Sequence, residues 1–401
     1  MRHISRFRPV LTEETHRATT FEIFFDIVFV FALTRLIAFM GEPPTLLSMA
    51  QGMLLLLLLM ISWGAYTWLG NQARADKGLV PAGTVIAMAA TFVAALVIPD
   101  AWRHGRDVNA PLTLAVAYIV IRAVQLALYF YAAAEDRQLR GKLLIFAVPT
   151  ALGWIVLILG AVLGGTAQTL LWAAAFVIDI GGGRVAYVFR GGWPLRSPRH
   201  FAERHGLVLI IALGESLISV GSGAGTAVAR WPVLVAALLG LSMTVCLWWL
   251  YFANAAATAE QALVQASGIR RDKIASDAYS LGLLPLIAGV IYLALGTEQV
   301  LADLARNRPQ HPFGEPLDWT STTALYGGVV LYLAGRLLFL RLAVRSAPPA
   351  QLVAAGVALL LLPAARGMPS LAALGLLTAF LIALVCYERL AQGSEAVTPS
   401  G

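Results

Sequence analysis

The stretch Thr20-Phe21-Glu22-Ile23-Phe24-Phe25-Asp26-Ile27-Val28-Phe29-Val30-Phe31-Ala32 opens an apolar run that continues to Met40. About 20 residues of helix span about 30 Å, which is enough to cross the hydrocarbon of a bilayer. Glu22 and Asp26 stand four residues apart, so a helix places both carboxylates on one side. Carboxylates that face lipid are costly. We therefore expect this side of the helix to face protein or water.

The composition indicates a membrane protein. The chain has 401 residues, of which 59% are hydrophobic and 13% charged, against roughly 25% charged in soluble domains. The mean hydropathy is +0.76. A soluble protein of this size could not cover so much apolar surface, so the predicted fold class is all-α, a polytopic transmembrane helical bundle. The basic N-terminus leads directly into the first span, and no cleavage site indicates a removable signal peptide.

About twelve apolar runs are visible, at 21–40, 46–69, 79–99, 111–133, 142–163, 166–189, 206–225, 231–253, 277–296, 320–340, 350–365 and 370–387. Most Lys and Arg residues fall in alternate connecting segments, beginning with the N-terminus. This bias predicts a multi-pass membrane protein with both termini in the cytoplasm. It also explains the net charge of +7, so we expect no nucleic-acid partner.

The order of features predicts two similar halves. Trp63 and Tyr66 recur as Trp248 and Tyr251, and a later arginine recurs after each. A parallel 6+6 repeat follows if these matches are not chance. The expected domains are a basic cytoplasmic N-terminus (1–20), a first transmembrane half (21–189), a cytoplasmic linker (190–205), a second half (206–390) and a disordered tail (391–401).

Charged residues at membrane depth are the main functional signal, because such residues pair with one another, line an aqueous cavity or relay protons. Mutual pairing between helices is the open alternative. Three glycines follow Asp179 and precede Arg184, which indicates either a loosened helix beside a site or close helix packing. The candidate substrate- or ion-binding residues are Glu22, Asp26, Arg122, Asp179, Arg184, Glu203, Arg204, His205, Glu215, Ser216 and Arg336.

A second distinctive stretch runs His200-Phe-Ala-Glu203-Arg204-His205-Gly206. Two histidines and a glutamate could ligate a metal, but His200, Glu203 and His205 fit no zinc spacing. We expect no metal there, and instead an ion-pair cluster at the start of a helix, where Glu203 suits the positive end of the dipole.

No phosphate-binding loop, dinucleotide fingerprint or redox cysteine pair is present, so no cofactor is expected. Cys246 and Cys386 read as small apolar residues. The remaining aromatic signal is a set of tryptophans that we expect in an interfacial belt. They are Trp63, Trp68, Trp248 and Trp249.

The segments Phe21–Ala32 and Glu203–Ser216 resemble the bacterial low temperature requirement A family, and Trp248–Phe252 fits the same pattern. The resemblance covers about residues 15–390. One departure is that an acidic residue would be expected where this chain has Ala253 and Asn254. The resemblance implies an integral protein of the bacterial inner membrane and supplies no substrate. It supports the importance of Glu22, Asp26, Glu203, Arg204 and Glu215.

The leading hypothesis is a secondary transporter of an unknown small solute, with protons as one candidate coupling ion. Its intramembrane carboxylates and arginines would line a central polar cavity, and its partners would be membrane lipids and the solute. Two alternatives stay open. One is a structural or lipid-sensing membrane protein whose charges only hold helices together. The other is an intramembrane enzyme for a lipid-linked substrate, with His200, Glu203 and His205 as acid and base.

Overall fold

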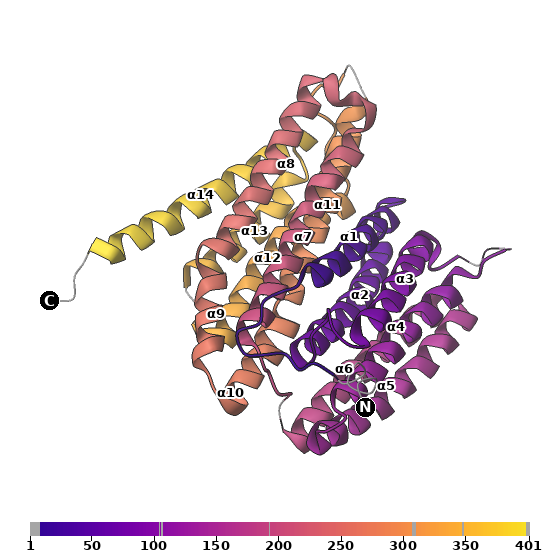
Figure 1. Ribbon diagram of the computed structural model, residues 1–401. Coiled ribbons are helices and arrows are strands. Elements are labelled where there is room, and N and C mark those ends of the chain that lie inside the picture. Colours follow the sequence, from indigo (N-terminus) through magenta and orange to yellow (C-terminus); the bar gives the residue numbers. More distant parts are fainter. Residues whose placement is uncertain are drawn as a thin grey trace. The chain divides into compact units, whose positions relative to one another are not determined.

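The computed structural model of the chain describes residues 9–103, 105, 107–191, 193–306, 310–346 and 349–397. Regular structure in these ranges is helical, with two isolated bridges and no strand (Figure 1). The helices are α1 (Thr20–Gly41), α2 (Leu46–Gln72), α3 (Val80–Val97), α4 (Ala110–Ala132), α5 (Arg137–Leu163), α6 (Gly165–Arg190), α7 (Pro198–Ala224), α8 (Trp231–Leu250), α9 (Ala256–Gln265), α10 (Gly268–Lys273), α11 (Leu284–Ala305), α12 (Trp319–Val344), α13 (Pro349–Ala365) and α14 (Ser370–Val397).

The predicted class, an all-α bundle of membrane-crossing helices, is confirmed. Within the described ranges, 11 helices are long and apolar enough to cross a membrane. The remaining predicted run, 350–365, corresponds to α13, which has 17 residues. Two of these long helices, Trp231–Gln265 and Gly268–Ala305, each combine two labelled helices. A π-helical segment joins the two parts, at Tyr251–Ala255 between α8 and α9 and at Ile274–Gly282 between α10 and α11.

The chain forms two compact units. The first comprises Met1–Val208 and Leu263–Ser280, and the second comprises Leu209–Ala262 and Leu281–Gly401. Helix α7 therefore contributes its first turns to the first unit and its remainder to the second. The predicted 6+6 repeat stays a prediction, as does the domain division built on it.

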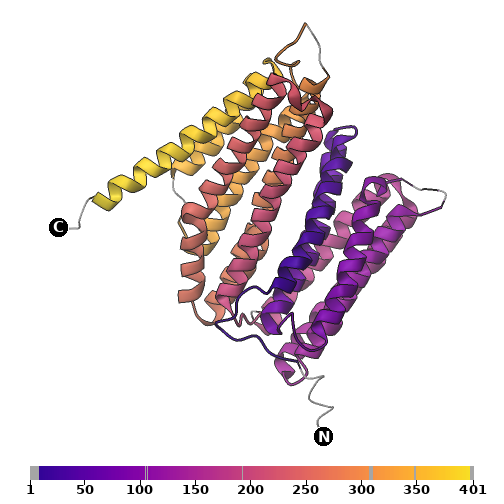
Figure 2. The same ribbon diagram turned by 45° about the horizontal axis from the view of Figure 1, so that its top comes forward.

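The first unit is a bundle built around α1–α6. Helix α4 packs on α2, α3 and α5, while α1 packs on α2 and α3. Figures 1 and 2 show these helices side by side in indigo to magenta. The N-terminal lead-in before α1 is pinned to this bundle: the backbone N–H of Thr12 donates to Gln72 O, and that of Arg74 donates to Val10 O. Arg2, Arg6 and Arg8, which belong to the basic N-terminus predicted to be cytoplasmic, lie outside the described residues.

The second unit is held by close packing of α11 on α12, with α8, α13 and α14 around them. Gly289 shows how close this packing is, because a Cβ there would lie 2.6 Å from both Gly328 O and Tyr332 N. Only glycine allows the two backbones this approach. Helix α14 continues to Val397, into the segment 391–401 where we expected a disordered tail, and residues 398–401 lie outside the described residues.

Candidate functional site: a polar ladder between α1 and α7

Glu22 divides its two carboxylate oxygens between two tasks. Helix α1 begins with a capping box in which Glu22 N donates to Thr19 Oγ1. In return, Glu22 Oε2 accepts from Thr19 N at 2.9 Å and from Thr19 Oγ1 at 3.0 Å. The other oxygen, Oε1, lies 2.9 Å from His200 Nε2 on α7. One half of the carboxylate therefore stabilises its own helix end, and the other half contacts the second helix.

The proton position on His200 follows from its neighbour Asn71, at the end of α2. Asn71 Oδ1 accepts from the backbone N–H groups of Arg196 and Ser197, which fixes the orientation of the amide. Its Nδ2 donates to Ser197 O at 2.7 Å and faces His200 Nδ1 at 3.4 Å. Because Asn71 presents a donor, Nδ1 is the acceptor of a neutral His200 ring. Nε2–H then donates to Glu22.

Asp26 and Arg204 form the next rung of the same ladder. Arg204 donates from Nη1 to Asp26 Oδ2 at 2.5 Å and from Nη2 to Oδ1 at 2.9 Å. Trp63 on α2 adds a third donor, Nε1–H, at 2.9 Å from Oδ1. The Arg204 guanidinium also lies 5.5 Å from the centroid of the Trp63 ring. Asp26 and Arg204 are 0% and 1% exposed, so this bidentate pair is dry.

The two rungs share one register. Glu22 and His200 are 178 positions apart in the chain, and so are Asp26 and Arg204. Both carboxylates stand four residues apart on α1, and both partners stand four apart on α7. This spacing places each set on one face of its helix. The start of α7 therefore runs parallel to α1 and presents two partners to its two acids. We call these four residues the polar ladder.

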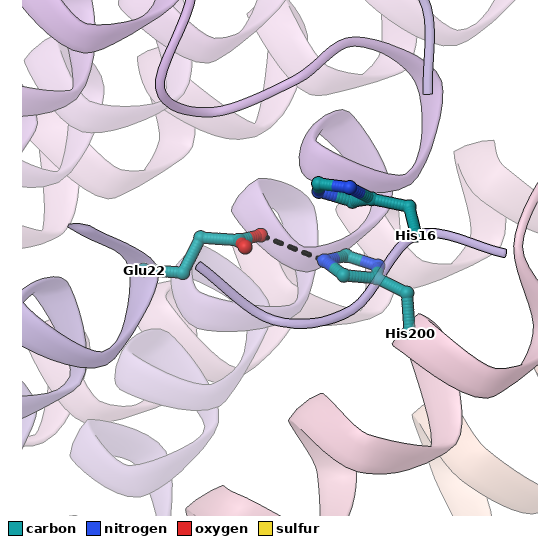
Figure 3. A group of neighbouring side chains, drawn as sticks. All are labelled: His16, Glu22 and His200. Carbon is teal, nitrogen blue, oxygen red and sulfur yellow. Dashed lines mark hydrogen bonds and ion pairs between the residues drawn. The ribbon is translucent and has the colours of Figure 1, made fainter. Parts of the chain in front are cut away.

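His16, on the lead-in before α1, closes the N-terminal end of the ladder. Its ring packs against that of His200 in a tilted arrangement, with centroids 5.3 Å apart and an interplanar angle of 33°. Figure 3 shows both imidazoles beside the Glu22 carboxylate. Burial lowers the pKa of His16 below its ordinary value, which favours the neutral imidazole. His16 Nε2 is buried and has no hydrogen-bond partner among the described residues.

The lead-in itself is held by the start of α7. Ser197 Oγ donates to the carbonyl oxygens of Glu14 and His16 at 2.9 and 3.0 Å. Glu203 Oε2 accepts from Ala18 N at 3.1 Å and lies 3.8 Å from Arg17 Nη1. Glu203 therefore acts on the lead-in and not on the ladder.

His205 has a third environment. Its Nδ1–H donates to Phe201 O at 2.8 Å, and its ring packs against those of Trp63, Phe201 and Tyr279. His200, Glu203 and His205 thus have separate partners, and the structure does not gather them into one acid–base cluster.

A second buried network involves α4, α5 and α6. Arg122 Nη2 lies 3.2 and 3.3 Å from the two carboxylate oxygens of Asp179. Tyr118 and Thr150 donate their hydroxyl protons to the same carboxylate at 3.0 and 2.8 Å. This Asp179 network belongs to the first unit, and among the described residues it shares no partner with the polar ladder. Arg184, the other candidate on α6, contacts Asp277 at 2.5 Å, and its side chain is 42% exposed.

The remaining candidates belong to the second unit. Glu215 is fully buried on α7, and Ser216 Oγ lies 2.8 Å from Thr244 Oγ1 on α8. Arg336 on α12 forms a bidentate pair with Glu388 on α14, at 2.6 and 2.8 Å.

Arg336 and Glu388 border a small pocket. The two residues at which the sequence departs from the expected acidic pattern also line this pocket. Ala253 and Asn254 line it together with Trp249 and Arg389. The Arg389 guanidinium lies 3.6 Å from the Trp249 ring centroid. In this chain the carboxylate beside Arg336 comes from α14.

Sequence reasoning missed four contributors to the first site: His16, Asn71, Trp63 and the role of His200. Trp63 was predicted to lie in an interfacial belt, which is wrong because its side chain is 1% exposed and bonded to Asp26. A signal for His200 existed, since His200 and Arg204 repeat the four-residue spacing of Glu22 and Asp26.

The long apolar helices and their buried charges define an integral membrane protein with many spans. The chain belongs to the bacterial low temperature requirement A (LtrA) family, whose model matches residues 17–386. It is similar to the uncharacterized protein RA0937 of Rhizobium meliloti (strain 1021), with 28% identity over 365 residues, 86% of this chain and 82% of that protein. No solved structure matches the present chain.

Proposed function

We propose that this protein is a secondary transporter of a small solute, and that the polar ladder is the element its transport cycle opens and closes. The observation that carries this proposal is the register of the ladder. Two adjacent buried carboxylates on one helix each meet a partner on a second helix, with the same offset. Because a dry ion pair is weak support for stability, its presence here needs another reason.

Coupling follows from the cost of opening the ladder. Removing the partner of a buried charge typically costs about 3–5 kcal/mol. Separation of α1 from α7 would leave Glu22 and Asp26 in this situation, unless a proton or another small cation takes the partner's place. Ladder opening and cation binding would therefore favour each other, which is the linkage that a coupled transporter needs.

The test is solute-dependent flux in proteoliposomes that enclose a pH-sensitive dye. A panel of amino acids, sugars, organic acids and metal cations is added outside, with and without an imposed membrane potential. We expect one solute class to change the internal pH with the wild-type protein. Glu22→Gln and Asp26→Asn should each reduce this response at least about tenfold, which corresponds to about 1.4 kcal/mol.

The matched control is Asp100→Asn, which neutralises an exposed acid whose partner is Arg103, 3.4 Å away. Its flux should equal that of the wild type. Absence of any solute response, or full flux in both ladder variants, would contradict the transport proposal.

A scaffold is the second candidate, and one observation favours it. Asp26, Asp179 and Glu388 each have an arginine partner, and Asp26 and Asp179 share no partner. Such separate pairs could serve only to fix helix contacts. In that case the reversal Asp26→Arg combined with Arg204→Asp should restore the stability that either single change removes.

We further propose that the protein lies in the bacterial inner membrane with both termini in the cytoplasm. The bias of Lys and Arg toward alternate connections supports this orientation. It would place the lead-in, His16 and the capping box of α1 at the cytoplasmic end of the ladder.

A further inference from the structure

We propose that His16, Glu22 and His200 form a binding site for a divalent transition-metal ion such as Zn²⁺. One ring nitrogen from each histidine and one carboxylate oxygen lie within 4.8 Å of one another (Figure 3). The three ligands come from three segments of the first unit: the lead-in, α1 and α7. This inference goes beyond the transport proposal and does not depend on it.

The donor set fits this class of ion. Two imidazoles and a carboxylate are ligands that zinc, cobalt and nickel accept, whereas magnesium and calcium prefer oxygen alone. With bond lengths of about 2.0–2.1 Å, two ligands of a tetrahedral zinc stand about 3.3 Å apart. His200 Nε2 and Glu22 Oε1 are 2.9 Å apart. A shift of about 1.5 Å by one side chain would close the largest separation.

His16 gives an independent reason to expect a ligand. Its Nε2 is buried without a hydrogen-bond partner among the described residues, and a buried polar atom of this kind costs free energy unless something satisfies it. The sequence indicated no metal site, because the three residues tested for metal-ligand spacing were His200, Glu203 and His205. Only His200 of these three belongs to the cluster in the structure. The structure replaces Glu203 and His205 with Glu22 and His16.

The local charge also permits a dication. Arg204 Nε lies 3.9 Å from Glu22 Oε1 and would repel a metal. Asp26 offsets that charge through its bidentate contact with Arg204. The three-residue cluster then carries one negative charge, that of Glu22, before a metal binds.

Asn71 sets how tightly the ion is held. A metal on His200 Nε2 requires the ring proton to lie on Nδ1, where Asn71 presents a donor and not an acceptor. Metal-bound histidines ordinarily donate this proton to an acceptor, and loss of that partner typically lowers affinity by roughly 10–100-fold. The site should therefore hold an exchangeable ion and not a permanent structural one.

The experiment uses the full-length protein in detergent, stripped of metal with a chelator. Co²⁺ is added while visible absorption is recorded, and Zn²⁺ is added by calorimetry and as a competitor of Co²⁺. We expect one saturable site per chain with the absorption of a low-coordinate cobalt centre. His16→Ala and Glu22→Gln should each weaken binding at least about tenfold.

The matched control is His311→Ala, because His311 is an exposed histidine whose own carboxylate neighbour, Glu315, lies 3.9 Å away. Its affinity should equal that of the wild type. Absence of saturable Co²⁺ or Zn²⁺ binding in the wild type would overturn the proposal, and this measurement needs no variant to fold. Unchanged affinity in a folded His16→Ala variant would overturn it too. Metal binding is measured in detergent, where no membrane or ion gradient exists. A failure to bind metal is therefore distinguishable from a failure to transport a solute.

Discussion

Asp26 accepts three hydrogen bonds from two side chains of other helices, and its own side chain is fully buried. Hydrogen bonds to a charged acceptor contribute about 1.5–3 kcal/mol each, more than bonds between neutral groups. At the scale of single residues, the ladder therefore depends on donors that satisfy a carboxylate with no access to water. Trp63 is the donor that can be removed without removing a charge.

Trp63→Phe should lower the free energy of unfolding by about 2 kcal/mol, because Asp26 Oδ1 loses the indole N–H. Trp68→Phe is the matched control: its indole donates to a neutral oxygen, Ser280 Oγ, at 3.0 Å, so the expected loss is about 1 kcal/mol. Unfolding by denaturant in mixed micelles measures both. A loss for Trp63→Phe no larger than that for Trp68→Phe would contradict the role assigned to the indole.

The face of α1 that carries the acids could be predicted, because a spacing of four residues has only one outcome on a helix. Their partners could not be predicted in the same way. The pairing of α1 with α7 depends on a register between segments 178 positions apart. The matching four-residue spacing of His200 and Arg204 is compatible with that register but does not select it. Arg122 shows the same limit: its position inside a helix was visible, but its partner could have been any of several acids.

At the scale of helices, the Asp179 network tests whether a buried ion pair in this protein only neutralises itself. Arg122→Leu should destabilise the first unit by about 3–5 kcal/mol, because Asp179 stays buried without its cation. Combining it with Asp179→Asn should restore most of that loss, because no charge then stays buried without a partner and the amide oxygen can still accept from Tyr118 and Thr150. Thermal unfolding in detergent compares the single and double variants. A double variant as unstable as Arg122→Leu would show that the pair does more than neutralise itself.

For the whole molecule, hydropathy predicted the class because a bilayer leaves few alternatives to long apolar helices. The spans were predicted where apolar runs are long, and the one marginal run became the short helix α13. With 17 residues, α13 extends about 26 Å, slightly less than the hydrocarbon thickness of about 30 Å. Whether α13 crosses decides if the two termini share a side.

We predict that α13 crosses the membrane. Topology reporters inserted after Arg345 and after Arg366 should therefore appear on opposite sides, with the first in the cytoplasm. Reporters after Asp318 and Arg345 flank the longer helix α12 and serve as the control for a crossing. If the reporter after Arg366 lay on the same side as the one after Arg345, α13 would not cross the membrane. The two termini would then lie on opposite sides, which would contradict the prediction.

The polar ladder is the central claim, and a double variant of its second rung tests it most directly. Asp26→Asn with Arg204→Met removes both charges, while the asparagine oxygen still accepts from Trp63. We predict a thermal midpoint close to that of the wild type but loss of solute-dependent flux in proteoliposomes. A stable double variant that transports as well as the wild type would show that the ladder is only a structural contact, which contradicts the account.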